Sequence, residues 1–276
     1  MKFSVLMSVY KNDNANYLKR AIQSVTIEQT KKPAQLVLVK DGHLPPETNI
    51  VIQNLQDLLS DNGIEFTVIS KEKNMGLAAA LNTGLKYCKY EYVARMDSDD
   101  ISLPKRFEIE FGYLNKHPEI SVLGGSIVEF ENDENTPLQA RLVPQQHDKI
   151  VEMLKTRNAM NHPTIVFKKS DILKLGGYSE DFGKLEDYKL WVDAVLAGLK
   201  LHNIADVCVN MRVGIGFIER RSERREIYDW DRLQSYLFNV KMIDKKKVLM
   251  NRFYIRAFIY MPIWLKRIAY RIFLRK

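Results

Sequence analysis

The sequence of 276 residues predicts an α/β fold built on a mainly parallel central sheet. Apolar runs of strand length alternate with segments of helical periodicity along residues 3–100, and polar or acidic residues directly follow the strand-like runs. Apolar residues make up 46% of the chain and charged residues 28%, the composition of a protein with an ordinary buried core. These proportions exclude a largely disordered or fibrous chain.

Strands and helices are expected to alternate along the first part of the chain. Continuous apolar runs predict strands at 3–9, 34–39, 65–69 and 91–96. Apolar residues at helical spacing predict helices between them, at 16–30, 50–59 and 77–88. This order gives parallel strands with helices on both faces and a ligand site beyond the carboxyl ends of the strands.

The second part of the chain is expected to continue the same domain. It is predicted to contain a helix at 105–116, a strand at 120–124 and a helix at 188–197. No linker rich in Pro, Gly or Ser separates these elements from the first part. Residues 1–240 are therefore predicted to form one domain, with residues 241–276 as a tail.

The formal net charge of +8 is concentrated in this tail. Residues 241–276 contain eleven Lys or Arg and one acid, Asp244, so the tail carries +10 and residues 1–240 carry −2. A nucleic-acid-binding protein would carry its cations on the folded domain, so no nucleic-acid partner is expected. The tail is predicted to meet an anionic surface instead.

The cysteines and the first residues indicate a cytoplasmic protein. Cys88 and Cys208 are the two cysteines, and neither has a second Cys or His at metal-ligand spacing. This pattern excludes a disulfide framework and a zinc ribbon and fits a reducing compartment. The first apolar run breaks at Lys11, too early for the core of a signal peptide.

Three carboxylates stand within four positions after the fourth predicted strand, at Asp97, Asp99 and Asp100. Like charges at this spacing raise one another's pKa unless a cation lies between them. Mg²⁺ or Mn²⁺ is suited to bridge carboxylate and diphosphate oxygens there. The alternative is a solvated acidic loop in which Asp100 or Ser102 caps the next helix.

Two other segments follow strands at the same edge of the sheet. Asp41 and Gly42 form either a plain turn or a carboxylate site for a base or ribose. Asn74 and Gly76 precede the third helix, and Asn74 is expected to cap its N-terminus. Either this is its whole role, or the N-terminus of the helix also contacts a ligand.

In order and spacing, these segments resemble family 2 glycosyltransferases, whose single domain has the GT-A fold. The resemblance rests on Ser8-Val9-Tyr10, Asp41-Gly42, Asn74-x-Gly76-Leu77, Asn82-Thr83-Gly84 and Asp97-Ser98-Asp99-Asp100. Three later segments are similar to the family's acceptor-side motifs: Asn161-His162-Pro163-Thr164, Gly176-Gly177-Tyr178 and Glu186-Asp187-Tyr188-x-Leu190-Trp191. The match covers residues 3–225. The arginine cluster formed by Arg220, Arg221, Arg224 and Arg225 resembles that of the branch that makes amylovoran and O-antigen repeat units.

The resemblance implies an inverting enzyme that moves a hexose from a nucleoside-diphosphate sugar, with UDP favoured, to a hydroxyl of a saccharide acceptor. The acceptor is expected to be linked to polyprenyl diphosphate, in bacterial surface polysaccharide assembly. Residues 1–103 would form the nucleotide-sugar half and residues 104–240 the acceptor half.

The resemblance also implies roles for individual residues. Asp187 matches the general base with Glu186 beside it, and Asp97 and Asp99 match the ligands of Mn²⁺ or Mg²⁺. The nucleotide-sugar site is expected to include Val9, Tyr10, Asp41, Asn74, Gly76, Asp97, Ser98, Arg212, Arg220 and Arg221. The acceptor side is expected to include His162, Tyr178 and Trp191.

Several of these residues also have purely structural interpretations. Asp187 suits the cap or first turn of a helix, and His162 suits a turn. Trp191 is three residues from Tyr188 and is expected in the core more than on a sugar, whereas Tyr178 is expected to face the acceptor. Arg220 and Arg221 also fit a solvated helix face. The family's Tyr-Arg-x-His is here Met211-Arg212-Val213-Gly214, without the histidine.

Two other function classes are weighed against this one. A sugar-phosphate nucleotidyltransferase would carry a Gly-rich loop after its first strand, where this chain has Tyr10-Lys11-Asn12-Asp13. A catalytically silent sugar-nucleotide-binding module would have degraded carboxylates, and here the carboxylates are intact.

Residues 251–276 alternate apolar and cationic side chains. The longest uncharged run, 257–265, has nine residues, less than half of the roughly 20 that span a bilayer. Because Pro262 interrupts this run, we expect short amphipathic helices that lie on the inner face of the cell membrane, making the protein peripheral there. The alternative is a helix that docks on the protein's own body or on a second subunit.

Overall fold

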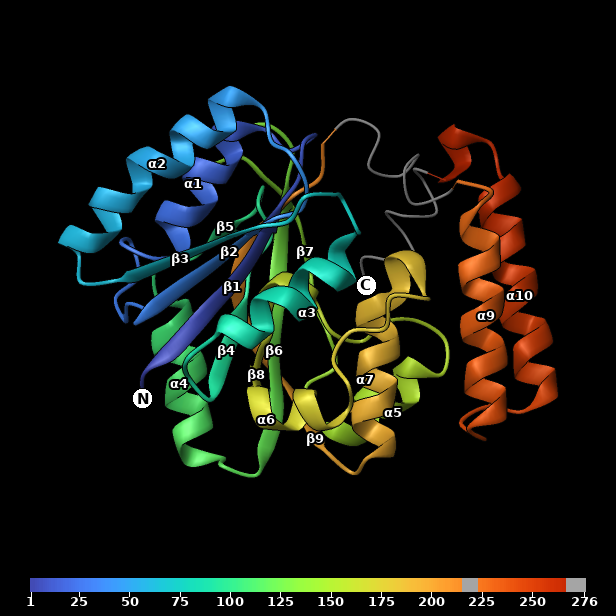
Figure 1. Cartoon of the computed structure of the whole chain (residues 1–276). Helices are drawn as coiled ribbons and strands as arrows, with labels where there is room; N and C mark the ends of the chain where they lie inside the picture. Colours follow the sequence, from blue (N-terminus) through green and yellow to red (C-terminus); the bar gives the residue numbers. More distant parts are fainter. Residues whose placement is uncertain (215–222, 267–276) are drawn as a thin grey trace.

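The computed structural model describes residues 1–214 and 223–266 (Figure 1). Within these residues a mixed, mainly parallel sheet has the strand order β3-β2-β1-β4-β8-β6-β9-β5, and β7 pairs with β6. This arrangement confirms the predicted fold class.

The first part of the sheet is parallel, as the alternation of elements predicts. It consists of β1 (Phe3–Val9), β2 (Gln35–Lys40), β3 (Glu65–Ser70) and β4 (Tyr92–Arg95). The connecting helices are α1 (Ala15–Val25), α2 (Pro46–Asp61) and α3 (Leu77–Tyr87). Alternate residues of β1 face opposite layers, because Val5 packs with α1 and α2 while Leu6 packs with α3.

The second part of the sheet is mixed. Its strands are β5 (Ile101–Ser102), β6 (Ile120–Phe130), β7 (Pro137–Arg141), β8 (Val166–Lys168) and β9 (Lys200–Arg212). Strand β8 runs antiparallel to β4 and β6, and β9 runs parallel to β6 and antiparallel to β5. The helices here are α4 (Arg106–Lys116), α5 (His147–Leu154), α6 (Lys169–Lys174) and α7 (Glu186–Leu196), with short 3₁₀ turns η1 (His162–Thr164) and η2 (Gly183–Leu185).

Three element boundaries differ from the predictions. Helix α1 ends at Val25 rather than at residue 30, because Thr26 and Gln29 donate side-chain hydrogen bonds to Ile22 O and Ser24 O in its last turns. Helix α2 begins at Pro46 rather than at residue 50, since proline suits the first helical position. Strand β6 continues to Phe130 rather than to residue 124, because it pairs with β9 along its length.

Helix α3 approaches the sheet closely at Gly84. A Cβ at this position would lie 2.4 Å from Leu6 Cδ1 and 2.8 Å from Val39 Cγ2. Such distances are shorter than van der Waals contact, so glycine is needed where the helix crosses β1 and β2. The close packing fixes the start of α3, which borders the candidate site.

Two helices at the C-terminal end of the described chain form a hairpin, α9 (Glu226–Asn239) and α10 (Lys245–Tyr260), seen at the right of Figure 1. Arg252 and Arg256 of α10 both pair with Asp231 of α9. Asn251 donates to Gln234 Oε1 at 2.7 Å and to Lys155 O at 2.9 Å. One face of α10 therefore docks on the protein's own body.

Neither helix of the hairpin is long and apolar enough to cross a bilayer. Within residues 1–214 and 223–266, no helix has the length and apolar character that crossing a membrane requires. Helix α10 ends at Tyr260, just before Pro262, which cannot continue the helical hydrogen bonds.

Both cysteines are free and buried, as the absence of a disulfide pattern predicts. Burial raises the pKa of Cys88 to about 12 and also raises the pKa of Cys208. Neither thiol is therefore ionised near neutral pH.

Candidate active site

The acidic loop after β4 is built around a buried cation, Arg95. This arginine is the last residue of β4 and is 1% exposed, and its Nη2 donates to Asp97 Oδ1 at 2.5 Å. Its Nε and Nη1 atoms have no hydrogen-bond partner among the residues described. Sequence analysis missed Arg95, although an arginine within an apolar strand just before three acids is a usable signal.

Asp13 is a second site residue that sequence analysis missed. Its Oδ2 accepts hydrogen bonds from Ser98 Oγ at 2.9 Å and from the Tyr10 backbone N–H at 3.0 Å. Burial and the nearby charge of Asp97 raise the pKa of Asp13 to about 6. The contact joins the end of β1 to the acidic loop across 85 positions of sequence, a separation that local patterns do not reveal.

Asp99 and Asp100 lie deeper in the same loop and contact Arg212 at the end of β9. Asp100 Oδ1 accepts the Arg212 backbone N–H at 2.8 Å, and the Asp99 carbonyl accepts from Arg212 Nε at 3.1 Å. Burial and the charge of Asp97 raise the pKa of Asp99 to about 6, and burial with the charge of Asp99 raises that of Asp100. Neither Asp100 nor Ser102 caps α4, whose N-cap is Lys105, so that alternative is wrong.

The guanidinium of Arg212 is held within the protein. It lies 3.8 Å from the Tyr17 ring centroid and 4.4 Å from that of Phe130. Its Nη1 also donates to the carbonyls of Glu131 and Asn132. The expected contact of Arg212 with a diphosphate stays a prediction. Arg220 and Arg221, the other two arginines predicted for the nucleotide-sugar site, lie outside the described residues.

Asp41 fastens the loop that precedes α3. Its two carboxylate oxygens accept the backbone N–H groups of Met75 and Gly76, both at 2.9 Å. Gly42 has a φ of +90°, and a Cβ there would lie 2.8 Å from Asn74 N. The N-cap of α3 is Gly76, so the expectation that Asn74 caps this helix is wrong. The backbone bonds to Asp41 bring the loop to the carboxyl end of β2 without an asparagine cap.

A cavity of about 1060 Å³ brings several of the predicted residues together. Its polar lining includes Gly76, Asp97, His162, Glu186 and Asp187, from the starts of α3, η1 and α7 and the loop after β4. The remaining predicted site residues in the described chain do not border this cavity. They are Val9, Tyr10, Asp41, Asn74, Ser98, Asp99, Tyr178, Trp191 and Arg212. Val9 is buried and Tyr10 is 40% exposed.

Glu186 and Asp187 open α7 and differ strongly in environment. Asp187 Oδ2 accepts a hydrogen bond from Asn158 Nδ2 at 2.7 Å. Glu186 is 4% exposed, and its Oε2 has no hydrogen-bond partner in the described chain. Burial and the charge of Asp187 raise the pKa of Glu186 to about 8. The helix N-cap is Leu185, so Asp187 is a first-turn acid and not the cap.

His162 is the member of the predicted acceptor group that faces the cavity. Its Nε2 lies 3.0 Å from the Tyr178 hydroxyl, and its ring lies 6.2 Å from that of Trp191. Burial and the charge of Arg95 lower its pKa to about 3, so the imidazole is neutral at physiological pH.

Tyr178 and Trp191 lie behind His162. They are 2% and 0% exposed, so the expectation that Tyr178 faces the acceptor is wrong, whereas the core position of Trp191 is confirmed. The reason is Asn82 of α3, which bonds both the backbone N–H and the carbonyl of Tyr178 at 2.8 Å and draws it inward.

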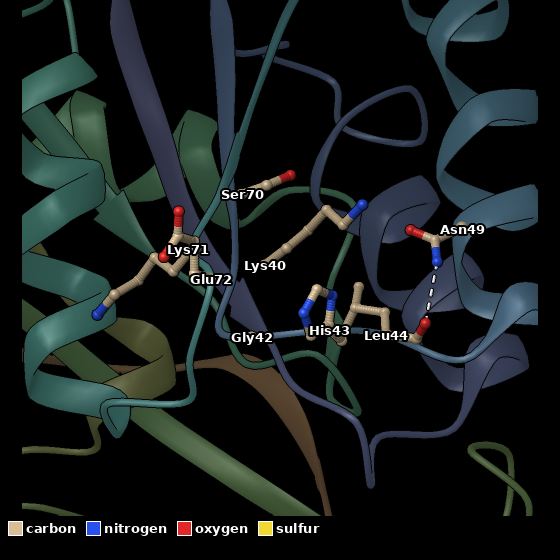
Figure 2. A pocket seen from close by; sticks show the side chains of 8 residues that line it. All are labelled: Lys40, Gly42, His43, Leu44, Asn49, Ser70, Lys71 and Glu72. Carbon is tan, nitrogen blue, oxygen red and sulfur yellow. Dashed lines mark hydrogen bonds between the residues drawn. The ribbon is translucent and has the colours of Figure 1, made fainter.

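A second, smaller cavity lies at the ends of β2 and β3. Figure 2 shows its side chains, and its volume is about 290 Å³. It is lined by Lys40, Gly42, His43, Leu44, Asn49, Ser70, Lys71 and Glu72, and it shares no lining residue with the larger cavity. Lys71 Nζ lies 3.5 Å from Asp41 Oδ1, so this cavity adjoins the position where a base or ribose is predicted.

The acidic loop has the donor chemistry of a divalent-cation site. Burial raises the pKa of Asp99, and the charges of Asp97 and Asp13 raise it further. A cation bound between these carboxylates would relieve their mutual repulsion. Within residues 1–214 and 223–266, no three Asp, Glu, His or Cys side chains are already arranged as a complete metal site. Mg²⁺ in proteins is commonly held by one or two carboxylates, with phosphate and water completing its shell, and the carboxylates of Asp97 and Asp99 are of the type that this requires.

Comparison with known proteins identifies the family. The profile described as "Glycosyl transferase family 2" matches residues 4–173, and the chain belongs to this family. It is 34% identical to the UDP-Gal:alpha-D-GlcNAc-diphosphoundecaprenol beta-1,3-galactosyltransferase of Escherichia coli, covering 91% of this chain and 88% of that protein. It is 31% identical to the amylovoran biosynthesis glycosyltransferase AmsE of Erwinia amylovora, covering 94% and 90% respectively.

Solved structures show the same fold at lower sequence identity. S. aureus TarS, residues 1–349, superposes with a TM-score of 0.66 at 18% identity and covers 99% of this chain and 75% of that chain. A Pyrobaculum calidifontis mannosyltransferase in complex with GDP-Man and Mn²⁺ gives 0.64 at 16% identity, covering 98% and 74%. The GT-A fold and the amylovoran and O-antigen branch are thus confirmed, and the protein is a glycosyltransferase.

The raised pKa of Glu186 predicts a specific dependence of stability on pH. Between its ordinary pKa of 4.5 and about 8, this carboxyl is ionised in the unfolded chain but protonated in the folded protein. Stability is therefore lost as the pH rises through this range. Glu186→Gln should remove that loss, so the melting temperature of the variant relative to wild type should be higher at pH 8 than at pH 4.5. The exposed Glu180→Gln is the control, and a pH-independent difference for Glu186→Gln would contradict the assignment.

Proposed function

We propose that the protein transfers a hexose, with inversion, from a UDP-sugar to a hydroxyl of a lipid-linked saccharide in the assembly of a bacterial surface polysaccharide. The observation that carries this proposal is the cavity in which Asp187 and the acidic-loop residue Asp97 face the same space. The Escherichia coli relative, named for UDP-Gal and a diphosphoundecaprenol acceptor, supports the choice of donor and acceptor. In the proposed arrangement residues 1–103 bind the nucleotide sugar and residues 104–240 complete the acceptor side.

Asp187 is the proposed general base. It accepts the proton of the acceptor hydroxyl while the hydroxyl oxygen bonds to the anomeric carbon and the nucleoside diphosphate leaves from the opposite face. The hydrogen bond from Asn158 holds one carboxylate oxygen, which fixes the orientation of the side chain. Neighbouring Glu186 stays largely protonated near neutral pH because it is buried beside Asp187. Asp187 is thus the member of the pair suited to accept a proton.

Asp97 and Asp99 are the proposed ligands of Mn²⁺ or Mg²⁺. Such an ion, when bound, stabilises the charge that develops on the leaving diphosphate. Asp97 is a third exposed and lines the cavity, whereas Asp99 lies deeper and is coupled to Asp97 and Asp13 by charge. His162 and the start of α3 at Gly76 are proposed to border the bound sugars.

Asp187→Asn separates catalysis from folding. The amide keeps an oxygen that can accept the Asn158 hydrogen bond, so we expect a melting temperature and a donor affinity near those of wild type. Transfer should fall by roughly 10² to 10⁴, the usual contribution of a general base. Asp181→Asn, an exposed change in the loop before η2, is the control and should transfer normally. Near-normal transfer by Asp187→Asn would move the base elsewhere.

Asp99→Ala tests the metal assignment. A carboxylate in the loop after a strand contributes little to the core, so the variant should remain folded but lose the gain in UDP-sugar affinity that Mn²⁺ gives. Nucleotide-sugar titrations with and without Mn²⁺, beside melting curves, measure both effects. The exposed Asp206→Ala is the matched acid-to-alanine control. A folded Asp99→Ala variant with unchanged metal-dependent affinity would refute the assignment.

We propose that the tail, residues 251–276, holds the enzyme on the cytoplasmic face of the cell membrane. In its described part, the side chains of Phe253, Tyr260, Ile263 and Trp264 lie outside the large cavity and are exposed, by 39% to 68%. Aromatic side chains of this kind sit at the membrane interface, and nearby lysines and arginines attract anionic lipid. The docked face of α10 is compatible with this role, because Arg252, Arg256 and Asn251 occupy a different side of the helix from Phe253.

The double variant Phe253→Ser/Trp264→Ser tests membrane association. It removes two exposed aromatics and leaves the α9 contacts intact, so the protein should stay folded but bind anionic liposomes less in a flotation assay. The control is Ile50→Ser/Tyr87→Ser, which removes two exposed apolar side chains from α2 and α3. Equal flotation of both double variants and wild type would contradict the proposal.

A further inference from the structure

The cavity that contains Asp187 has a second, apolar part that the transfer of a sugar does not require. Helix α10 and the chain just beyond it contribute Tyr254, Ile255, Ala257, Phe258, Ile259 and Met261 to the lining, and α9 contributes Trp230 beside the polar Glu226. A sugar ring presents hydroxyl groups that need hydrogen-bond partners, which hydrocarbon side chains such as those of Ile255, Phe258 and Ile259 do not supply. This part of the lining is therefore suited to an apolar segment of a ligand.

The volume of the cavity agrees with an additional occupant. At about 1060 Å³ it lies just above the roughly 300–1,000 Å³ that enclose a drug-sized ligand. The apolar wall and the catalytic carboxylate Asp187 belong to one continuous space. A single ligand that is polar at one end and apolar at the other matches this lining better than a free saccharide.

The position of the apolar wall is fixed by the polar contacts of neighbouring residues of α10. Arg252 and Arg256 pair with Asp231, and Asn251 bonds both Gln234 and the Lys155 carbonyl. These bonds set the rotation of α10 about its axis. As a result Ile255 and Phe258, three residues apart on the helix, turn towards the cavity, while Phe253 is 68% exposed and lies outside the lining.

The lining also carries positive charge close to the base. Arg141 from the end of β7 and Arg157 from the loop after α5 both border the cavity. Arg157 directly precedes Asn158, whose side chain holds Asp187. Guanidinium groups are well suited to pair with phosphate oxygens. The lining thus combines a catalytic carboxylate, cations and an apolar wall.

We propose that this wall is the binding surface for the lipid of the acceptor. The first isoprene units of a polyprenyl diphosphate pack against Ile255, Phe258 and Met261, the diphosphate lies near Arg141 and Arg157, and the attached sugar reaches Asp187. This inference rests on the proposed function and adds the part of the chain that recognises the lipid. It assigns α10 two apolar faces, an inner one for the acceptor and an outer one for the membrane.

The test uses farnesyl diphosphate, a short isoprenoid diphosphate, at concentrations below its aggregation and in the absence of membranes. Its affinity for the full-length protein is measured by calorimetry for wild type, Phe258→Ala, Ala257→Glu and Phe238→Ala. Ala257 is an exposed lining residue, so its charged replacement alters the wall with little risk to folding. Phe238→Ala is the matched control, since it removes the same kind of side chain from an exposed position of α9 outside the cavity lining.

Wild type and Phe238→Ala should bind farnesyl diphosphate equally, and Phe258→Ala and Ala257→Glu should bind it about tenfold more weakly or worse. No binding by wild type, or equal binding by all four proteins, would overturn the inference. Transfer to a water-soluble saccharide with the same terminal sugar is measured in parallel. If that transfer persists without farnesyl diphosphate binding, the lipid surface is wrong and the proposed function stands. If binding depends on Phe258 but no sugar is transferred, the proposed function fails instead.

Discussion

The candidate site depends on the ion pair between the buried Arg95 and Asp97 at the end of β4. An unpaired guanidinium in this position would be very costly, and the pair places a carboxylate at the edge of the cavity. The same positive charge lowers the pKa of Glu186 and of Asp100, against the stronger effect of burial. Arg95 therefore couples the acidic loop to the start of α7 electrostatically. Two segments about 90 positions apart in the sequence thus share one buried charge.

Backbone hydrogen bonds to acidic side chains hold the rest of the site in place. Asp41 binds the loop before α3, Asp13 ties the end of β1 to Ser98, and Asp100 holds the end of β9. Strand pairing brings the two segments of each pair close together, and the hydrogen bonds to the carboxylate then fix one segment against the other. Several of the acids that sequence analysis would assign to ligands are thus also part of the scaffold. Removing one of them would alter loop geometry as well as local charge.

The parallel half of the fold could be predicted because its strands are fully buried and read as continuous apolar runs. Strand β9 was not predicted, since polar residues such as His202, Asn203 and Asp206 interrupt its apolar pattern. The motif residues Asp97, His162 and Asp187 were found in sequence and meet in one cavity. Asp13, Arg95 and the inward position of Tyr178 were missed, because their environments arise from contacts between distant segments.

The two buried cysteines give the protein a practical property. Cys88 and Cys208 are shielded from solvent, and their raised pKa values leave almost no thiolate, the form that reacts with maleimides and similar reagents. A cysteine introduced on the exposed side of α10 would therefore react far faster than either native thiol. The wild-type sequence can thus carry a single fluorophore or spin label without prior replacement of its own cysteines. With a second introduced cysteine on an exposed position of the sheet, the distance between the two labels would report how the α9–α10 hairpin sits relative to the sheet.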